Sequence, residues 1–86
     1  MKTVIDLVCF CGEKAQESVS GRINFTTYSK NKFCAEIGLE YTSLSKRQKE
    51  EVRFAMIDLY NTAVSSRVAR EKSGDREHYN NRILSI

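Results

Sequence analysis

The feature that most constrains the fold is a long amphipathic helix in the second half of the sequence. Ser45, followed three residues later by Gln48, has the pattern of a capping box, in which two side chains close the first turn of a helix. The apolar residues that follow recur on one helical face: Val52, Ala55, Met56, Leu59 and Ala63. The pattern predicts a helix from Lys46 to about Lys72, with Gly74 as the residue after its end. We expect the apolar stripe to pack on a sheet.

Three stretches before this helix predict β-strands. Residues 3–11 are rich in β-branched and apolar residues, residues 21–28 alternate, and residues 33–41 alternate most clearly. Alternation is typical of an antiparallel sheet with one solvent-exposed face, and short connections favour a three-stranded meander. The sequence therefore predicts a single α+β domain over residues 1–86. Its parts are a small antiparallel sheet of about three strands, one long α-helix and a docked C-terminal tail.

A second apolar stripe on the long helix needs its own cover. It lies about 120–200° round the helix from Val52, at 100° per residue. Its members are Phe54, Ile57, Val64 and Val68. One sheet cannot cover both stripes, so the second is covered either by the aliphatic residues 83, 84 and 86 or by another copy of the chain. The first alternative predicts a docked tail over residues 75–86, whose conformation the sequence leaves open, and the second predicts a homodimer.

Composition is that of an ordinary globular protein. The chain has 86 residues, of which 41% are hydrophobic and 29% charged. It has no run of about 18 apolar residues, so no transmembrane helix is predicted. Asp6 interrupts the apolar run near the N-terminus, and no small-residue cleavage site follows, which argues against a signal peptide. With an odd number of cysteines, three, we expect a reducing compartment, the cytoplasm of a host cell.

The cysteines have the right number for a metal site but the wrong spacing. Cys9, Cys11, Cys34 and His78 together make a Cys₃His set, which is one of the ligand sets of structural zinc. On a strand, however, Cys9 and Cys11 would point the same way about 6.5 Å apart, and Cys34 would face solvent. A disulfide between Cys9 and Cys11 would distort the backbone. We predict no metal, and Cys9 and Cys11 as small core residues.

Motifs for catalysis are weak. The four glycines are isolated, so there is no Gly-rich phosphate loop, and the single histidine has no evident nucleophile near it in sequence. Glu36 and Glu40 would share a strand face, but four residues along a strand is about 13 Å, too far for paired-carboxylate chemistry. We predict a protein that is not an enzyme and needs no cofactor.

Positive charge gathers at the start of the long helix. Residues 1–41 are neutral overall, so the whole net charge of +3 lies in residues 42–86. The cluster consists of Lys46, Arg47, Lys49 and Arg53. A helix N-terminus favours acidic side chains, so three cations in the first turn oppose the local preference and indicate an anionic partner. The alternative is that Glu50 and Glu51 neutralise them and the face is merely soluble.

The arrangement resembles the second half of a double-stranded RNA-binding domain, over roughly residues 21–65. In that family three antiparallel strands lead to a helix whose first turn carries lysines that touch phosphates. Here the helix begins "SKRQKEEV", without the family's alanine-rich continuation, and residues 1–20 do not predict the family's first helix. The resemblance implies phosphate contact at the basic first turn.

Size and architecture also resemble phage-encoded inhibitors of host machinery, including anti-CRISPR proteins. That resemblance implies a small non-enzymatic inhibitor, encoded by a phage or mobile element. It would bind a host protein or ribonucleoprotein complex for nucleic-acid processing or defence. The alternative is a protein that binds RNA or DNA directly through the basic turn. In both cases we expect the basic cluster and the second apolar stripe to form the partner-binding surface, without a membrane.

Overall fold

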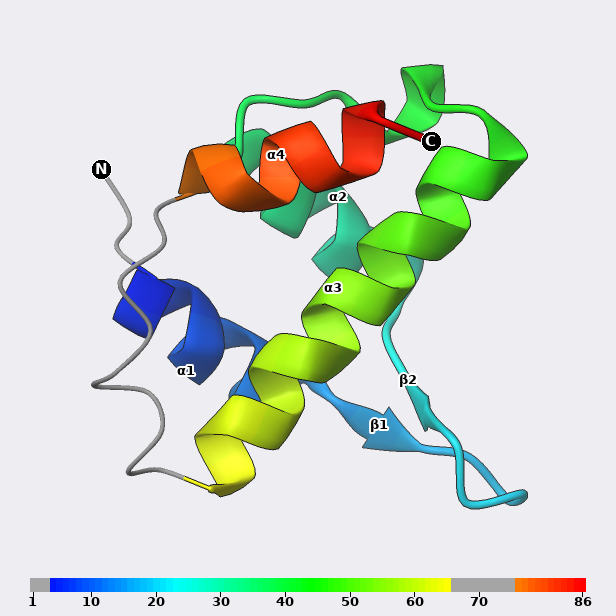
Figure 1. Cartoon of the computed structure of the whole chain (residues 1–86). Coiled ribbons are helices and arrows are strands. Elements are labelled where there is room, and N and C mark those ends of the chain that lie inside the picture. Colours follow the sequence, from blue (N-terminus) through cyan, green and yellow to red (C-terminus); the bar gives the residue numbers. More distant parts are fainter. Residues whose placement is uncertain (1–3, 66–75) are drawn as a thin grey trace.

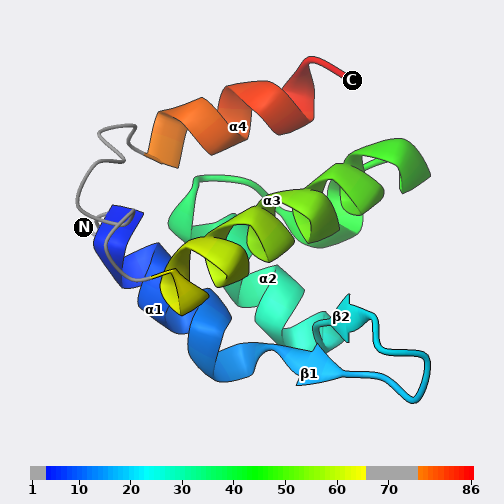
Figure 2. The same ribbon diagram turned by 60° about the horizontal axis from the view of Figure 1, so that its bottom comes forward.

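The computed structural model describes residues 4–65 and 76–86. Its elements are α1 (Val4–Lys14), β1 (Gln16–Glu17), β2 (Ile23–Asn24), α2 (Thr27–Glu36), the 3₁₀ turn η1 (Tyr41–Ser43), α3 (Lys46–Val64) and α4 (Arg76–Leu84). The long helix α3 crosses the whole molecule (Figure 1). It lies between α4 on one side and α1 with α2 on the other (Figure 2). The fold is α+β in a coarse sense, because the described strands form only one two-stranded antiparallel hairpin.

The predicted strand over residues 3–11 is wrong, because residues 4–14 form helix α1. Buried side chains follow helical spacing there, at Leu7, Val8 and Cys11, whereas Ile5 and Cys9 are exposed. α1 packs chiefly against α3. At their contact a Cβ on Gly12 would lie 3.1 Å from the Cβ of Ala63, so the lack of a side chain at Gly12 lets the two helices approach closely. Packing on α3 therefore outweighs the strand preference of the β-branched residues in this stretch.

The predicted strand over residues 33–41 is also wrong. Helix α2 starts at its N-cap Thr26, whose hydroxyl accepts a hydrogen bond from the Ser29 amide at 3.1 Å. It ends at Glu36, with Ile37 as C-cap and Gly38 as the residue after the cap, where a φ of +81° favours glycine. The Leu39 amide donates to the Cys34 carbonyl at 2.8 Å, and the Gly38 amide donates to the Ala35 carbonyl at 3.2 Å, which is a Schellman motif. Local caps at both ends thus override the alternating pattern.

The middle predicted strand, residues 21–28, is reduced to two residues. β2 pairs antiparallel with β1, with Gln16 opposite Asn24 and Glu17 opposite Ile23. The turn between them contains Gly21, with φ of +78°. An antiparallel strand pair is present, but its strands are residues 16–17 and 23–24, and the predicted pairing of residues 21–28 with residues 3–11 and 33–41 is wrong.

The start of the long helix is predicted correctly and its end is not. α3 begins at Lys46 and ends at Val64, with Ser65 as C-cap. Gly74, which we predicted to follow the helix, lies outside the described residues. The predicted core stripe is confirmed: Val52, Ala55, Met56 and Leu59 are buried and Ala63 is half-buried. α1 and α4 pack on this helix in place of the predicted sheet.

Helix α4 is the docked tail. Tyr79 and Ile83 are buried, and the ring of Tyr79 meets the ring of Phe33 edge to face, with centroids 6.4 Å apart. Asn80 donates from Nδ2 to the Ile37 carbonyl at 2.8 Å, which ties α4 to the end of α2. The tail is therefore docked, through Tyr79 and Ile83, and is helical over Arg76–Leu84. Leu84 and Ile86, two of the three aliphatic residues on which the prediction rested, are exposed. Among the helices of the described ranges, none is long and apolar enough to cross a membrane.

Candidate functional site

The first turn of α3 is fixed by a complete capping box. The Gln48 amide donates to Ser45 Oγ at 3.2 Å, and the Ser45 amide donates to Gln48 Oε1 at 2.9 Å. Both members of the predicted pair are thus in place. These bonds fix the backbone of the first turn. Lys46 and Arg47, the next two residues, therefore extend into solvent from a rigid backbone.

The cations of the first turn are not neutralised by the acids that follow them. Glu50 binds Arg53, with Oε1 and Nη1 3.2 Å apart. Glu51 binds Arg82 of α4, with Oε1 and Nε 2.7 Å apart. Both carboxylates therefore have cationic partners outside the first turn, contrary to the alternative in which they balance it.

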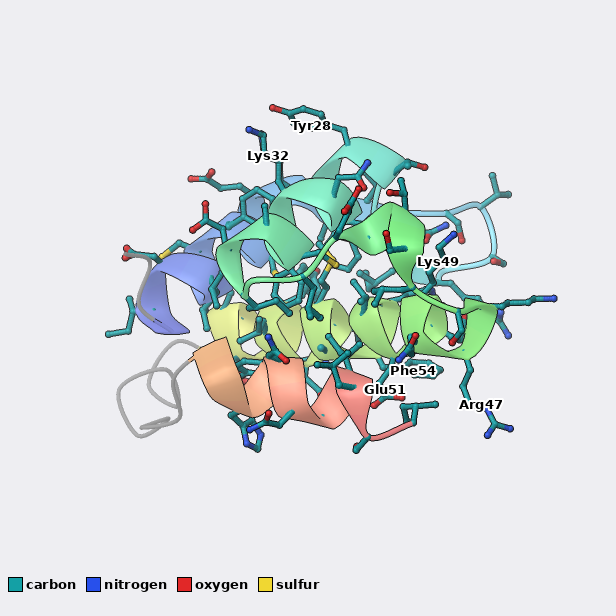
Figure 3. The ribbon with its side chains drawn as sticks, turned by 90° about the horizontal axis from the view of Figure 1, so that it is seen from above. Tyr28, Lys32, Arg47, Lys49, Glu51 and Phe54 are labelled. Atoms are coloured by element: carbon teal, nitrogen blue, oxygen red, sulfur yellow. The ribbon has the colours of Figure 1, made fainter. Side chains whose placement is uncertain are left out.

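Three cations thus remain at the positive end of the helix dipole. Lys46 and Arg47 are exposed, and the first turn contains no acid. Lys49 is half-buried, with its Nζ 5.4 Å from the centre of the Tyr41 ring. Within the described ranges none of the three makes an ion pair. Arg47 and Lys49 extend to opposite sides of α3 (Figure 3), so they present charge over a broad surface.

The fourth cation of the cluster, Arg53, has a different environment. Its guanidinium carbon lies 5.5 Å from the centre of the Phe54 ring while the same group binds Glu50. The charge of Arg53 is therefore partly neutralised, and its guanidinium lies beside an exposed aromatic ring. The Phe54 side chain is 43% exposed.

The second apolar stripe is only partly covered. Ile57 is half-buried and packs against the core, whereas Val64 is 68% exposed. Val68 lies outside the described residues. α4 does not bury Phe54 or Val64, so the prediction that the tail covers the whole stripe is wrong for these two residues. Whether another chain covers them stays a prediction.

Arg82 forms a contact that the sequence pattern did not indicate. It donates from Nε to Glu51 at 2.7 Å and from Nη1 to Asp58 at 2.8 Å, so it bridges two turns of α3. The hydrogen bonds to Asp58 and Glu51 raise the pKa of Arg82 above its ordinary value. The only trace in the sequence is the spacing of Glu51 and Asp58, seven residues apart on one helical face.

The cysteines divide into one exposed and two buried thiols. Cys9 is exposed, so its predicted core position is wrong, because on a helix it does not share a face with Cys11. Cys11 is in the core as predicted, and so is Cys34, which we predicted to face solvent. Burial raises the pKa of Cys11 to about 12 and that of Cys34 to about 11, so both remain neutral thiols near pH 7.

Among the described residues no three His, Cys, Asp or Glu side chains are arranged to hold a metal ion. His78 is exposed and its ring stands edge to face with Tyr79, with centroids 5.2 Å apart. The arrangement that remains is a rigid first turn with three cations that make no ion pair in the described chain, and aromatic rings beside Lys49 and the following Arg53.

Comparison with known proteins gives no relative: no protein family, curated protein or solved structure matches this chain. The resemblance to a double-stranded RNA-binding domain does not extend to the architecture. Residues 27–36 are helical where that resemblance requires strand. A helix does precede the hairpin, at residues 4–14, which the sequence did not predict, but the three-stranded sheet of that family is not formed in the described chain. What remains of it is a helix with cations in its first turn.

Proposed function

We propose that this protein is a small non-enzymatic binding protein, and that the basic first turn of α3 docks on an anionic surface of its target. In this proposal it acts as an inhibitor that blocks a nucleic-acid-processing or defence complex of a host cell. The observation that supports this most is the pairing of Glu50 with Arg53 and of Glu51 with Arg82. Because these acids are engaged elsewhere, Lys46, Arg47 and Lys49 are available to an anion.

The electrostatics of α3 support a functional role for this turn. Each cation at a helix N-terminus opposes the dipole by about 0.3–1 kcal/mol. A turn selected for stability would carry Asp or Glu there. The capping box adds a rigid base, so little ordering is needed when a partner binds.

Direct binding of RNA or DNA is the second candidate, and the cation–aromatic pairs favour it. Lys49 lies over Tyr41, and Arg53 lies over Phe54. Aromatic rings beside cations are the usual means of holding single-stranded nucleic acid, since bases stack on the rings and phosphates meet the charges. Binding of this kind weakens steeply as salt rises.

The decisive experiment is charge reversal with a matched control. The test variant replaces Lys46, Arg47 and Lys49 with Glu. The control variant replaces Lys14, Arg22 and Lys30 with Glu, so both variants change the net charge from +3 to −3. We expect the test variant to unfold at the same or a slightly higher urea concentration, because acids suit the helix dipole.

Binding is measured in two assays. Immobilised protein captures partners from a nuclease-treated host lysate, and gel shifts use duplex RNA, duplex DNA and single strands over a salt series. We expect the test variant to lose the captured partner by at least tenfold and the control to retain it. Equal capture by both variants would reject the basic turn as the binding surface. A salt-sensitive gel shift that only the test variant loses would replace the inhibitor proposal with direct nucleic-acid binding.

A further inference from the structure

A small concave site lies between α1 and α2, away from the basic turn of α3. It is lined by Leu7 and Phe10 from α1 and by Lys32 and Glu36 from α2, and its volume is about 190 Å³. Tyr28 and Lys32 project together from the outer face of α2, far from Arg47 (Figure 3). The site therefore belongs to a different surface from the one proposed above.

The two walls of this site differ in chemistry. α1 supplies apolar groups: Leu7 is 1% exposed and Phe10 is half-buried at the edge of the core. α2 supplies a polar rim, formed by Lys32 and Glu36, and Tyr28 lies one turn before Lys32 on the same face of the helix. Lys32 Nζ lies 5.6 Å from the centre of the Tyr28 ring, and within the described chain it makes no ion pair.

The volume of the site and the charge of Lys32 together indicate what kind of group can bind there. Cofactor and drug-sized ligands occupy sites of roughly 300–1,000 Å³, so about 190 Å³ suits one apolar side chain. Partner proteins commonly anchor themselves by placing such a side chain in a pocket. The available cation at the Tyr28 end of the rim suits a carboxylate beside that anchor. A nucleic acid fits poorly, because the α1 wall is apolar and the lining includes a single cation, Lys32.

We propose that the site between α1 and α2 binds a segment of a partner protein that carries one aliphatic anchor side chain followed by an acidic residue. The aliphatic group enters between Leu7 and Phe10, and the carboxylate pairs with Lys32 beside Tyr28. This proposal does not depend on the function proposed for α3, because the two surfaces share no residue.

The test uses short peptides and two-dimensional ¹H–¹⁵N NMR spectra of the whole protein. The probe is acetyl-Leu-Asp-amide. The comparison ligands are acetyl-Gly-Asp-amide, acetyl-Leu-Lys-amide and isovalerate, which lack the anchor, the negative charge and the peptide backbone respectively. We expect saturable shifts with acetyl-Leu-Asp-amide that are confined to the amides of α1 and α2 around the four lining residues, and binding at least fivefold weaker with each comparison ligand.

Two variants on α2 make the test specific. Lys32→Glu should abolish binding of acetyl-Leu-Asp-amide and create binding of acetyl-Leu-Lys-amide. Lys30→Glu is the matched control, because two residues along a helix point it about 160° away, and it should bind as the unchanged protein does. The proposal is overturned by unsaturable or scattered shifts, by equal binding of the glycine peptide, or by insensitivity to Lys32→Glu. Isovalerate binding as strongly as the peptide would assign the site to small carboxylates instead of a protein partner.

Discussion

At the scale of single residues, the three cysteines show how far a side chain's environment follows from its neighbours in sequence. Cys11 was expected in the core from its apolar surroundings, and it is there with 0% exposure. The faces assigned to Cys9 and Cys34 were both wrong, because a strand and a helix place alternate residues differently. The apolar neighbours of a cysteine therefore predicted that some cysteines are small core residues. Which of the three are buried depends on whether the segment is a helix or a strand.

The buried thiols predict a loss of stability in alkali. The unfolded chain releases thiol protons near the ordinary pKa of 9.0, whereas the folded chain holds them up to about 11 at Cys34 and about 12 at Cys11. This contribution to stability is fully present below pH 9.0 and is lost as the pH rises towards the folded values. At about pH 10 we expect each buried thiol to lower the free energy of unfolding by about 1.4 kcal/mol.

Urea unfolding between about pH 8 and about pH 10 checks this expectation. Cys34→Ala should flatten the pH dependence by about half, since it removes one of the two buried thiols. Cys9→Ala is the control, and we expect it to leave the pH dependence unchanged because Cys9 is exposed. A free energy of unfolding that is constant over this range would contradict the assignment of Cys11 and Cys34 as buried neutral groups.

At the scale of elements, α3 was predictable because its signals are local. Ser45 and Gln48 define its start within four residues, and its buried stripe repeats over several turns. α1 was not predicted because its sequence is rich in β-branched and apolar residues, and packing against α3 outweighs that strand preference. α2 was not predicted because part of its sequence alternates between apolar and polar residues, as a strand does. One neglected signal was Thr26 followed by Ser29, with Gly38 beyond the last turn, which together bracket α2.

In the candidate site, too, the local features could be predicted from the sequence and the long-range contacts could not. The basic cluster was visible in the sequence because its cations are consecutive or nearly so. Their lack of neutralisation was not visible, because it depends on Arg82, which is 31 residues from Glu51 along the chain. Long-range ion pairs of this kind leave no periodic pattern.

The capping box gives the element-scale prediction. Ser45→Ala removes the acceptor of the Gln48 amide and should lower the free energy of unfolding by about 1 kcal/mol, within a range of about 0.5–2. Ser43→Ala is the matched control, because Ser43 is exposed and its side chain makes no hydrogen bond in the described chain. Urea unfolding followed by circular dichroism measures both. Equal stability of the two variants would show that the box does not hold the first turn.

At the scale of the whole molecule, stability depends on the docking of α4 against the other helices. Ile83 is completely buried, while its neighbour Leu84 is 50% exposed. We expect Ile83→Ala to lower the free energy of unfolding by about 2–5 kcal/mol, because it leaves a cavity in the core. Leu84→Ala, which removes a side chain of similar size one position away, should change it by no more than about 0.5 kcal/mol.

Thermal unfolding of the two variants tests whether α4 belongs to one cooperative unit. A single transition that shifts to lower temperature in Ile83→Ala and stays in place in Leu84→Ala is the expected result. An early, separate loss of helix in Ile83→Ala, with the main transition unmoved, would show that α4 unfolds independently of α1, α2 and α3.

Because Tyr79 and Ile83 follow α3 in the sequence, some time passes during protein synthesis between the completion of α3 and the addition of the residues that dock α4. The nascent chain contains all of α1, α2 and α3 once Val64 has been added, yet Phe33 lacks the ring of Tyr79 until the ribosome has made 15 more residues, and Ile83 follows four residues later. At about 5–20 residues per second, the ribosome adds these residues in roughly 1–4 s. The core shared by the four helices can therefore close only after α1, α2 and α3 have all been made, whatever the order in which the helices form.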